Sequence, residues 1–238
     1  MYKPRKNIDL VVPFNNENQN LQTLIPKILK TIKRIKKFNF RLIFIDDGST
    51  DGGSLIVKKF KKNNNKIILL KNSNKFGQTY CYKSYLRKFK NADFIRMDAD
   101  NQDDPIYLIK LSKFITKGYD IILTDRKLRK HSIYMIILTF VYDLLISILI
   151  GTKLKTYSSS MVCFKTKYLS KKKLKYNDHR YLPIIAIHNG IKKIKVFSVM
   201  HRPRLHGYTK YAMFRKIVFA FPEFLYFYYR LKKGFFNK

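Results

Sequence analysis

The chain has 238 residues, of which 46% are hydrophobic, so it can bury the core of one α/β domain or of two small ones and is not globally disordered. Its 50 lysine and arginine residues against 15 aspartate and glutamate residues give a formal net charge of +35. This charge predicts attraction to polyanions such as nucleic acid, anionic lipid or phosphorylated ligands. Cys81 and Cys163 are too few for a disulfide framework or a four-cysteine zinc site, and we expect buried thiols in a reducing compartment.

The first half of the chain alternates short apolar runs with amphipathic stretches. The apolar runs predict strands, and the stretches with helical spacing of apolar residues predict helices. The expected strands cover 8–13, 41–45, 66–70, 93–97 and 119–123, and the expected helices cover 20–37, 54–62, 77–89 and 105–116. This alternation predicts an α/β fold with a mostly parallel sheet and helices on both faces.

Polar residues follow each of the first four expected strands. They lie at 15–17, 46–47, 72–74 and 98–104, at the carboxyl end of each strand. Ligands of open parallel sheets bind beyond this edge. The clusters therefore predict the position of the functional site.

The second half contains two apolar stretches with basic borders. Residues 133–150 are nearly all apolar, with Asp143 as the one charged residue, and 217–229 are apolar and aromatic. Three structures are open for 133–150: a helix in the membrane interface or against protein, a spanning helix, and a helix of a soluble core. The basic borders favour the interface. The N-terminus has no signal-peptide pattern, so we expect the cytoplasm or the cytoplasmic face of a membrane.

Residues 91–104 contain five of the 15 acidic residues. Asp98 and Asp100 alternate at the end of an expected strand, so both carboxylates can face one site. These donors, with the side-chain carbonyl of Gln102, suit Mg²⁺ or Mn²⁺ carrying a diphosphate. The alternative is that the cluster only caps the following helix, which one aspartate at 103–104 can do alone.

Several segments carry a resemblance to a known family. The first half contains, in order, VPFNNE at 12–17, DDGSTD at 46–51, NKFG at 74–77 and MDADNQDDP at 97–105, and the second contains DHRYLP at 178–183, Gly190 and HRPRLHGYTKY at 201–211. Together these segments resemble the family 2 glycosyltransferases of the GT-A (Rossmann-like) fold. The similar subgroup is the dolichol-phosphate mannosyltransferase-like enzymes, which glycosylate polyprenyl phosphates. The resemblance covers about residues 8–215.

The resemblance implies a role for each matching position. The implied nucleotide-sugar site contains Pro13, Asn15, Glu17, Asp46, Asp98, Arg204 and Lys210, of which the last two close over the donor diphosphate. Asp100 and Gln102 are the implied metal ligands, and Arg126, assisted by Arg129, is the implied contact of the acceptor phosphate. Asp98, Asp100 and Arg126 form the implied catalytic set. The family usually has tyrosine at the position of Asn15 and leucine at that of Asn101.

The implied reaction is inverting transfer of a sugar from GDP-mannose or a UDP-sugar to dolichyl or undecaprenyl phosphate. A phosphate monoester has a second pKa of about 6, so the acceptor is ionised near pH 7 and needs no strong base. The second half agrees, because its acidic residues are only Asp143, Asp178 and Glu223. Two alternatives stay open. One is transfer to a glycan hydroxyl in polysaccharide or cell-envelope synthesis, with Asp178 as the main candidate base. The other is a basic nucleic-acid-binding protein, against which the ordered acidic motifs count.

The same resemblance implies the domain organisation and the partners. A GT-A catalytic domain is expected at 1–215, with 131–150 inserted as an interfacial helical segment, and a basic, aromatic, membrane-proximal helix at 216–238. The expected partners are the nucleotide sugar, the polyprenyl phosphate and an anionic membrane surface, with no nucleic acid. Two further partners stay open: a separate membrane protein, on which the chain would rely to reach the membrane, and a second copy of the chain.

Overall fold

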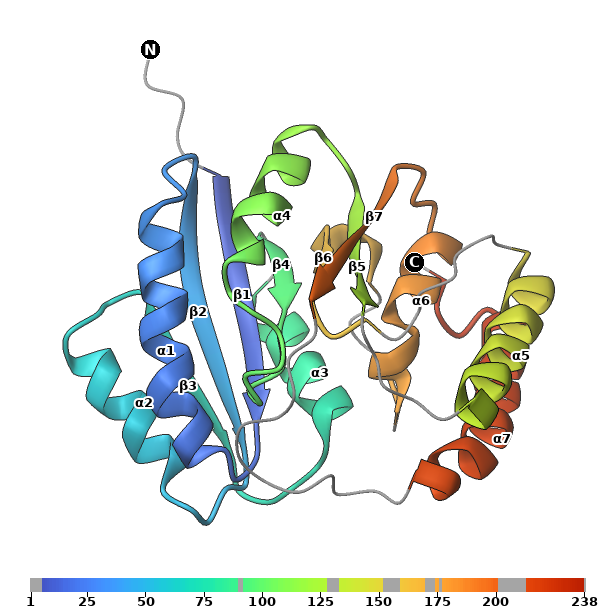
Figure 1. Cartoon of the computed structure of the whole chain (residues 1–238), viewed down its shortest axis with the longest axis horizontal. Coiled ribbons are helices and arrows are strands. Elements are labelled where there is room, and N and C mark those ends of the chain that lie inside the picture. The colour runs from blue at the N-terminus through green and yellow to red at the C-terminus, as the bar shows by residue number, and fades with distance from the viewer. Residues whose placement is uncertain are drawn as a thin grey trace.

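The computed structural model describes residues 6–89, 92–127, 133–151, 159–169, 174–175, 177–200 and 213–237. A seven-stranded sheet runs through its centre in the order β3-β2-β1-β4-β6-β5-β7 (Figure 1). Its strands are β1 (Lys6–Phe14), β2 (Phe38–Asp47), β3 (Ile67–Asn72), β4 (Asp93–Arg96), β5 (Ile121–Lys127), β6 (Val162–Phe164) and β7 (Ile194–Met200). The expected α/β fold with a mostly parallel sheet is confirmed.

The helices follow the strands in alternation through the first half. They are α1 (Asn18–Lys33), α2 (Gly53–Lys62), α3 (Gln78–Lys88), α4 (Tyr107–Thr116), α5 (Ile133–Ile150), α6 (Leu182–His188) and α7 (Met213–Lys232), with short 3₁₀ turns at Thr166–Tyr168 and Asp178–Tyr181. Each helix expected in the first half is present. Pro105 was expected in the first turn of α4, but the helix begins two residues later, at Tyr107.

β6 and β7 were not predicted. β6 has three residues and pairs antiparallel with both β4 and β5, so it joins the two parallel parts of the sheet. β7 pairs parallel with β5 at the edge, with Arg126 opposite Val199. These two strands attach the second half of the chain to the parallel sheet that the first half forms.

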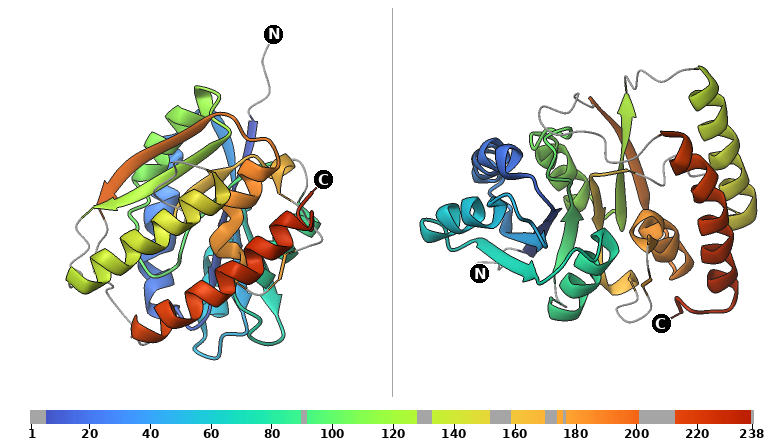
Figure 2. Two further views of the ribbon diagram at one scale, coloured as in Figure 1. Left: turned by 90° about the vertical axis from the view of Figure 1, so that its right-hand side faces the viewer. Right: turned by 90° about the horizontal axis from the view of Figure 1, so that it is seen from below.

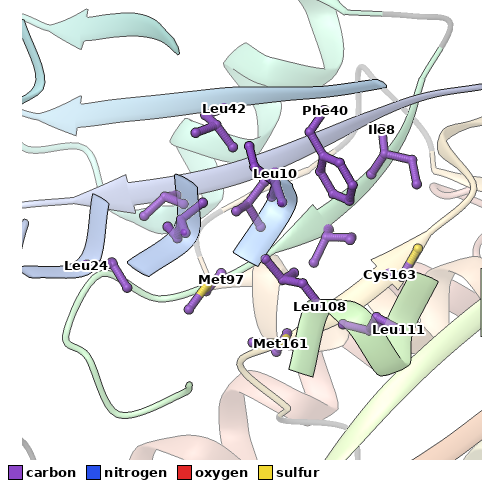
Figure 3. Packing of buried hydrophobic residues seen from close by; sticks show 14 of the residues in the cluster. Ile8, Leu10, Leu24, Phe40, Leu42, Met97, Leu108, Leu111, Met161 and Cys163 are labelled. Atoms are coloured by element: carbon purple, nitrogen blue, oxygen red, sulfur yellow. The ribbon is translucent and has the colours of Figure 1, made fainter. Parts of the chain in front are cut away.

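Two hydrophobic clusters lie on the two faces of the sheet, as alternation along the strands requires. Leu10 belongs to the cluster beneath α1, α2 and α4, together with Leu24 and Leu108. Figure 3 shows this packing, in which Met97, at the start of the acidic loop, is also buried. Val11 faces the other cluster, which contains residues of α3, α5, α6 and α7. Helices therefore cover both faces, as expected.

Helices α5 and α7 lie side by side on the outside of the second cluster (Figure 2). The ring of Tyr142 in α5 contacts that of Phe224 in α7, with centroids 6.1 Å apart. The expected domain boundary at 215/216 falls inside α7, whose Phe224, Phe227 and Leu231 are buried in the second cluster. Across the described segments, no helix is both long enough and apolar enough to cross a membrane.

Candidate functional site

Four loops meet at one edge of the sheet. β1, β2, β3 and β4 are parallel neighbours in the sheet, so the segments that follow them leave from the same edge. Figure 1 shows these strands pointing in one direction. The loops begin at residues 15, 48, 73 and 97, so the predicted polar residues lie in these loops or, for Asp46, Asp47 and Asn72, at the end of the preceding strand.

The loop after β1 is tied to the loop after β2. The side-chain amide of Asn15 donates to the carbonyl oxygens of Asp47 and Gly48, at 2.8 and 3.3 Å. Asn16, whose φ is +57°, accepts a bond from the Thr50 amide at 2.8 Å. Asn15 therefore has a structural role in joining the two loops, and its place in a nucleotide pocket stays a prediction.

The two aspartates at the end of β2 have different surroundings. Asp46 is fully buried, and its carboxylate accepts from the Ser49 amide at 2.8 Å and from the Ser54 hydroxyl. A nucleotide held by Asp46 would therefore have to share its carboxylate with these two donors. Pro13 lies in the buried end of β1, next to Ile45 of β2.

Asp47 was not among the predicted site residues, although it fastens the third loop to the second. Its carboxylate accepts from the amides of Phe76 and Gly77, at 2.9 and 2.7 Å, and from the Asn72 side chain at 2.9 Å. Gly48 follows with a φ of +69°, and a Cβ there would lie 2.6 Å from the carbonyl carbon of Asn74. The third loop thus approaches the second so closely that position 48 requires glycine.

The acidic loop after β4 is linked to α3. The Gln78 side chain, in the first turn of α3, lies 3.5 Å from a carboxylate oxygen of Asp98, which is half-buried. Asp100 is 8% exposed, and its carboxylate accepts from the amide of Gln102 at 3.2 Å. The two predicted metal ligands are therefore neighbours within one tight turn.

The capping alternative for the acidic cluster holds for one residue. The Asp104 carboxylate accepts from the amide of Ile106 at 2.9 Å, just before α4. Asp103 accepts from the hydroxyl of Ser160, which ties the loop to the segment just before β6. Helix capping therefore accounts for Asp104, but it does not account for the acidic residues of the turn at 98–102.

The basic part of the predicted site is not placed. Arg129, Arg204 and Lys210 lie outside the described residues. The backbone of Arg126 lies in β5, beside Val199 of β7, and its side chain is outside the described part. The roles implied for these residues stay predictions.

A buried arginine behind the acidic loop was missed. Arg96, the last residue of β4, donates to the carbonyl oxygen of His179 at 2.5 Å and to that of Ser159. His179 in turn lies 2.9 Å from the Thr79 hydroxyl through its Nδ1. Arg96 thereby holds two segments of the second half against the strand that carries the acidic loop. His179 therefore has a structural role in this arrangement.

His179 gives the protein a predicted pH dependence. Burial, then the charges of Arg96 and Arg180, lower the pKa of His179 from 6.5 to about 3. Between these pH values the unfolded chain binds a proton that the folded chain does not, so stability rises with pH. We expect the free energy of unfolding to increase between pH 4 and 6.5, by at most about 1.4 kcal/mol per pH unit from this group.

Urea unfolding at several pH values measures this slope, and His179→Asn should reduce it. Burial alone would raise the pKa of Asp120, but its bonds with Lys165 and with the Lys193 amide outweigh this and lower the pKa from 3.8, so its contribution is lost at more acidic pH than the range tested. His188→Asn is the matched control, because it leaves the His179 ring in place. A slope unchanged by His179→Asn would contradict the prediction.

Asp178, the candidate base of the glycan alternative, is not available to an acceptor. Its side chain is 1% exposed and forms a two-pronged ion pair with Arg230 of α7, which is 2% exposed. It also accepts from the amide of Lys175 at 2.6 Å. Glu223 is paired with Arg180 at 2.9 Å. These contacts count against Asp178 as the candidate base of that alternative, because both of its carboxylate oxygens hold α7.

The donor set of the turn suits a hard divalent cation bound together with a diphosphate. Among the described residues, no group of three or more histidine, cysteine, aspartate and glutamate side chains is placed to hold a metal ion. Asp100 and Gln102 offer one carboxylate and one amide oxygen. Mg²⁺ is commonly held by one or two protein oxygens, with phosphate oxygens and waters completing its six positions. The residues present thus fit a metal that arrives with its nucleotide.

Comparison with known proteins identifies a family and several relatives. The family model described as glycosyl transferase family 2 matches residues 9–176. An undecaprenyl-phosphate 4-deoxy-4-formamido-L-arabinose transferase of Pectobacterium carotovorum is 26% identical over 213 residues, covering 89% of this chain and 64% of that protein. A dodecaprenyl-phosphate galacturonate synthase of Rhizobium johnstonii is 26% identical over 236 residues, covering 96% of this chain and 70% of that protein.

The fold also matches solved structures. The glucosyl-3-phosphoglycerate synthase of Mycobacterium tuberculosis, crystallised with Mn²⁺, UDP and glucosyl-3-phosphoglycerate, superimposes with a TM-score of 0.65 at 14% identity. The match covers 92% of this chain and 79% of that one. At this identity it supports the fold alone. The chain spans about 64% of the length of the arabinose transferases that it matches.

Proposed function

Because the chain belongs to glycosyl transferase family 2, we propose that it transfers a sugar from a nucleotide diphosphate sugar to a polyprenyl phosphate at a membrane surface. Two relatives named for undecaprenyl and dodecaprenyl phosphates support this acceptor class. The four segments of resemblance in the first half lie at the carboxyl ends of the strands or in the loops that follow them, at 12–17, 46–51, 74–77 and 97–105.

The observation that carries the proposal is the bonding of these loops into one frame. Asn15 joins the first loop to the second, Asp47 joins the second to the third, and Gln78 joins α3 to Asp98 of the fourth. A donor bound at this edge would meet Glu17 and Asp46 on the β1–β2 side and Asp98 and Asp100 on the β4 side. The β1–β2 side would then bind the nucleoside of the donor, and the β4 side would bind its diphosphate.

Asp100 and Gln102 would hold Mg²⁺ or Mn²⁺ in this reaction. When bound, the cation supplies positive charge that neutralises the leaving diphosphate. Asp98, half-buried and fixed by Gln78, would orient the donor beside it. Arg126, Arg204 and Lys210 would complete the charge around the two phosphate groups, and preorganised charge of this kind is often the largest contribution to catalysis.

The acceptor needs no strong base, because a lipid phosphate is largely ionised at neutral pH. This fits a second half in which Asp178 and Glu223 are both committed to arginines. Direct attack by the phosphate oxygen on the anomeric carbon breaks the bond to the nucleotide diphosphate and inverts the configuration. The glycan alternative has lost its main candidate base.

The test is a screen of radiolabelled UDP- and GDP-sugars with undecaprenyl phosphate in detergent, with and without MnCl₂. We expect a lipid-linked sugar from one donor, formed only with the metal and with inverted configuration. No lipid product from any donor, or a product of retained configuration, would contradict the proposal.

The lipid acceptor also requires a surface that meets the membrane, and we place it on α5 and α7. Their outer faces carry large apolar side chains at helical spacing, which we call the α5/α7 patch: Ile137, Phe140, Val141, Leu144, Leu145 and Ile148 of α5, and Phe221, Leu225, Tyr226 and Tyr229 of α7. Phe140 and Ile148 are 65% and 67% exposed. Lysines border it, with Lys233 6.0 Å from the Tyr229 ring and Lys175 5.9 Å from that of Tyr226. Apolar side chains with basic neighbours favour an anionic bilayer as the occupant.

The double variant Phe140→Glu, Ile148→Glu is expected to bind vesicles of phosphatidylcholine and phosphatidylglycerol about tenfold more weakly or worse. The reason is that two exposed apolar side chains no longer enter the bilayer. Vesicle flotation measures the bound fraction. Leu55→Glu is the matched control, since Leu55 is 66% exposed on α2. Equal effects of the two changes, or no vesicle binding by the unmodified chain, would contradict the assignment.

A further inference from the structure

Asn101 lies between the two expected metal ligands and turns the chain there. Its φ is +60°, a left-handed conformation that asparagine adopts more readily than most residues. The turn is closed by the bond from the Gln102 amide to the Asp100 carboxylate, at 3.2 Å. The backbone at residue 101 therefore fixes the relation of its two neighbours.

The side chain of Asn101 fastens this turn to helix α1. It is 5% exposed, and its amide nitrogen lies 2.9 Å from the carbonyl oxygen of Asn20, 3.3 Å from the Asn20 side-chain oxygen and 2.8 Å from the Thr23 hydroxyl. Thr23 donates its own hydrogen to the Asn20 carbonyl, at 3.1 Å, so its oxygen is free to accept. Both amide hydrogens of Asn101 are thus directed at α1.

The same contact reaches the nucleotide side of the site. Asn20 is 2% exposed, and its side-chain amide donates to the Glu17 carboxylate at 2.6 Å. Glu17 precedes α1 in the first loop, which the proposed function gives to the nucleotide. A continuous chain of hydrogen bonds therefore runs from Glu17 through Asn20 to Asn101, between the two halves of the site.

We propose that Asn101 is a positioning residue that holds Asp100 and Gln102 in the geometry of the metal–diphosphate and couples them to the nucleotide side through Asn20. The inference rests on the proposed function. A leucine at this position could neither donate to α1 nor adopt the left-handed turn without strain. The side chain of Asn101 therefore acts as a polar clamp between the turn and α1.

The test is binding of Mn²⁺ in the presence of UDP or GDP, followed by the electron paramagnetic resonance signal of free Mn²⁺. Asn101→Gly keeps the left-handed backbone and removes the clamp. We expect it to weaken Mn²⁺ binding about tenfold or more, as loss of a group that orients metal ligands commonly does. Thr23→Val, which removes one acceptor, should have a smaller effect, and the two changes together should be less than additive.

Asn177→Gly is the matched control, because Asn177 also has a left-handed φ, of +65°, but bonds to Glu223 instead. Each of the two changes removes a side-chain hydrogen bond and should lower the melting temperature, but Asn177→Gly should leave Mn²⁺ affinity unchanged. If the Asn101→Gly variant folds and binds Mn²⁺ with unchanged affinity, the proposed role of Asn101 is wrong, while the proposed function of the protein still stands. Failure of the unmodified chain to bind Mn²⁺ with either nucleotide would overturn the clamp and the proposed function together.

Discussion

Replacing Asp100 by alanine is expected to lower metal-dependent sugar transfer by about 100-fold or more, comparable to the loss of one preorganised group that stabilises transition-state charge. Asp100 is 8% exposed and sits in the turn with Gln102, where alanine would remove its carboxylate from the proposed metal site. The measurement is the initial rate of lipid-linked sugar formation over a range of MnCl₂ concentrations. The deficit should persist at saturating metal.

Asp104→Asn is the matched control for this change. Its carboxylate caps the Ile106 amide at 2.9 Å, and an asparagine can accept the same bond. The control removes one negative charge from the same loop, so it separates the local charge from the specific position. Comparable losses from both variants, or full activity of Asp100→Ala, would contradict the metal assignment.

The sequence predicts the first half well because its signals are local. The strand at 8–13 appears within β1, and the polar residues behind it reach the same edge as those behind β2 and β4. Parallel strands place their carboxyl ends together whatever the details of their side chains. For this reason the loops of the site could be named before their contacts were known.

β6 and β7 escape the same reasoning for different reasons. β6 has three residues, too few to display a period, and its place between β4 and β5 depends on pairing with distant strands. β7 has inward Phe197 and Val199 in alternation, a signal that was present in the sequence. The topology of the second half therefore could be predicted only in part.

The side chains that organise the site were the least predictable. Asp47 is hydrogen-bonded to Gly77, Arg96 is hydrogen-bonded to Ser159, and Asn101 is hydrogen-bonded to Asn20. In each pair the two residues are far apart in the chain. Their residue types allow many roles, and only the fold selects one. Asp178 illustrates the cost of reasoning from type alone, since a carboxylate that suits a base proves to be an ion-pair partner.

The pair between Arg230 and Asp178 supports the second prediction of large effect, on stability. Arg230→Met is expected to lower the free energy of unfolding by about 3–5 kcal/mol, because it leaves the buried charge of Asp178 without its partner. The guanidinium also packs between the rings of Tyr226 and Phe236, at 4.8 and 5.1 Å. Urea unfolding followed by circular dichroism measures the change.

The chain provides its own control for this prediction, because a second arginine–carboxylate pair joins the same two elements. Arg180 and Glu223 are 37% and 30% exposed, so Arg180→Met should cost at most about 1 kcal/mol. Adding Asp178→Asn to Arg230→Met should recover much of the loss, since the asparagine oxygen can still accept from the Lys175 amide. Equal costs for the two arginines, or no recovery in the double variant, would mean that the packing of α7, rather than the buried charge, determines its attachment.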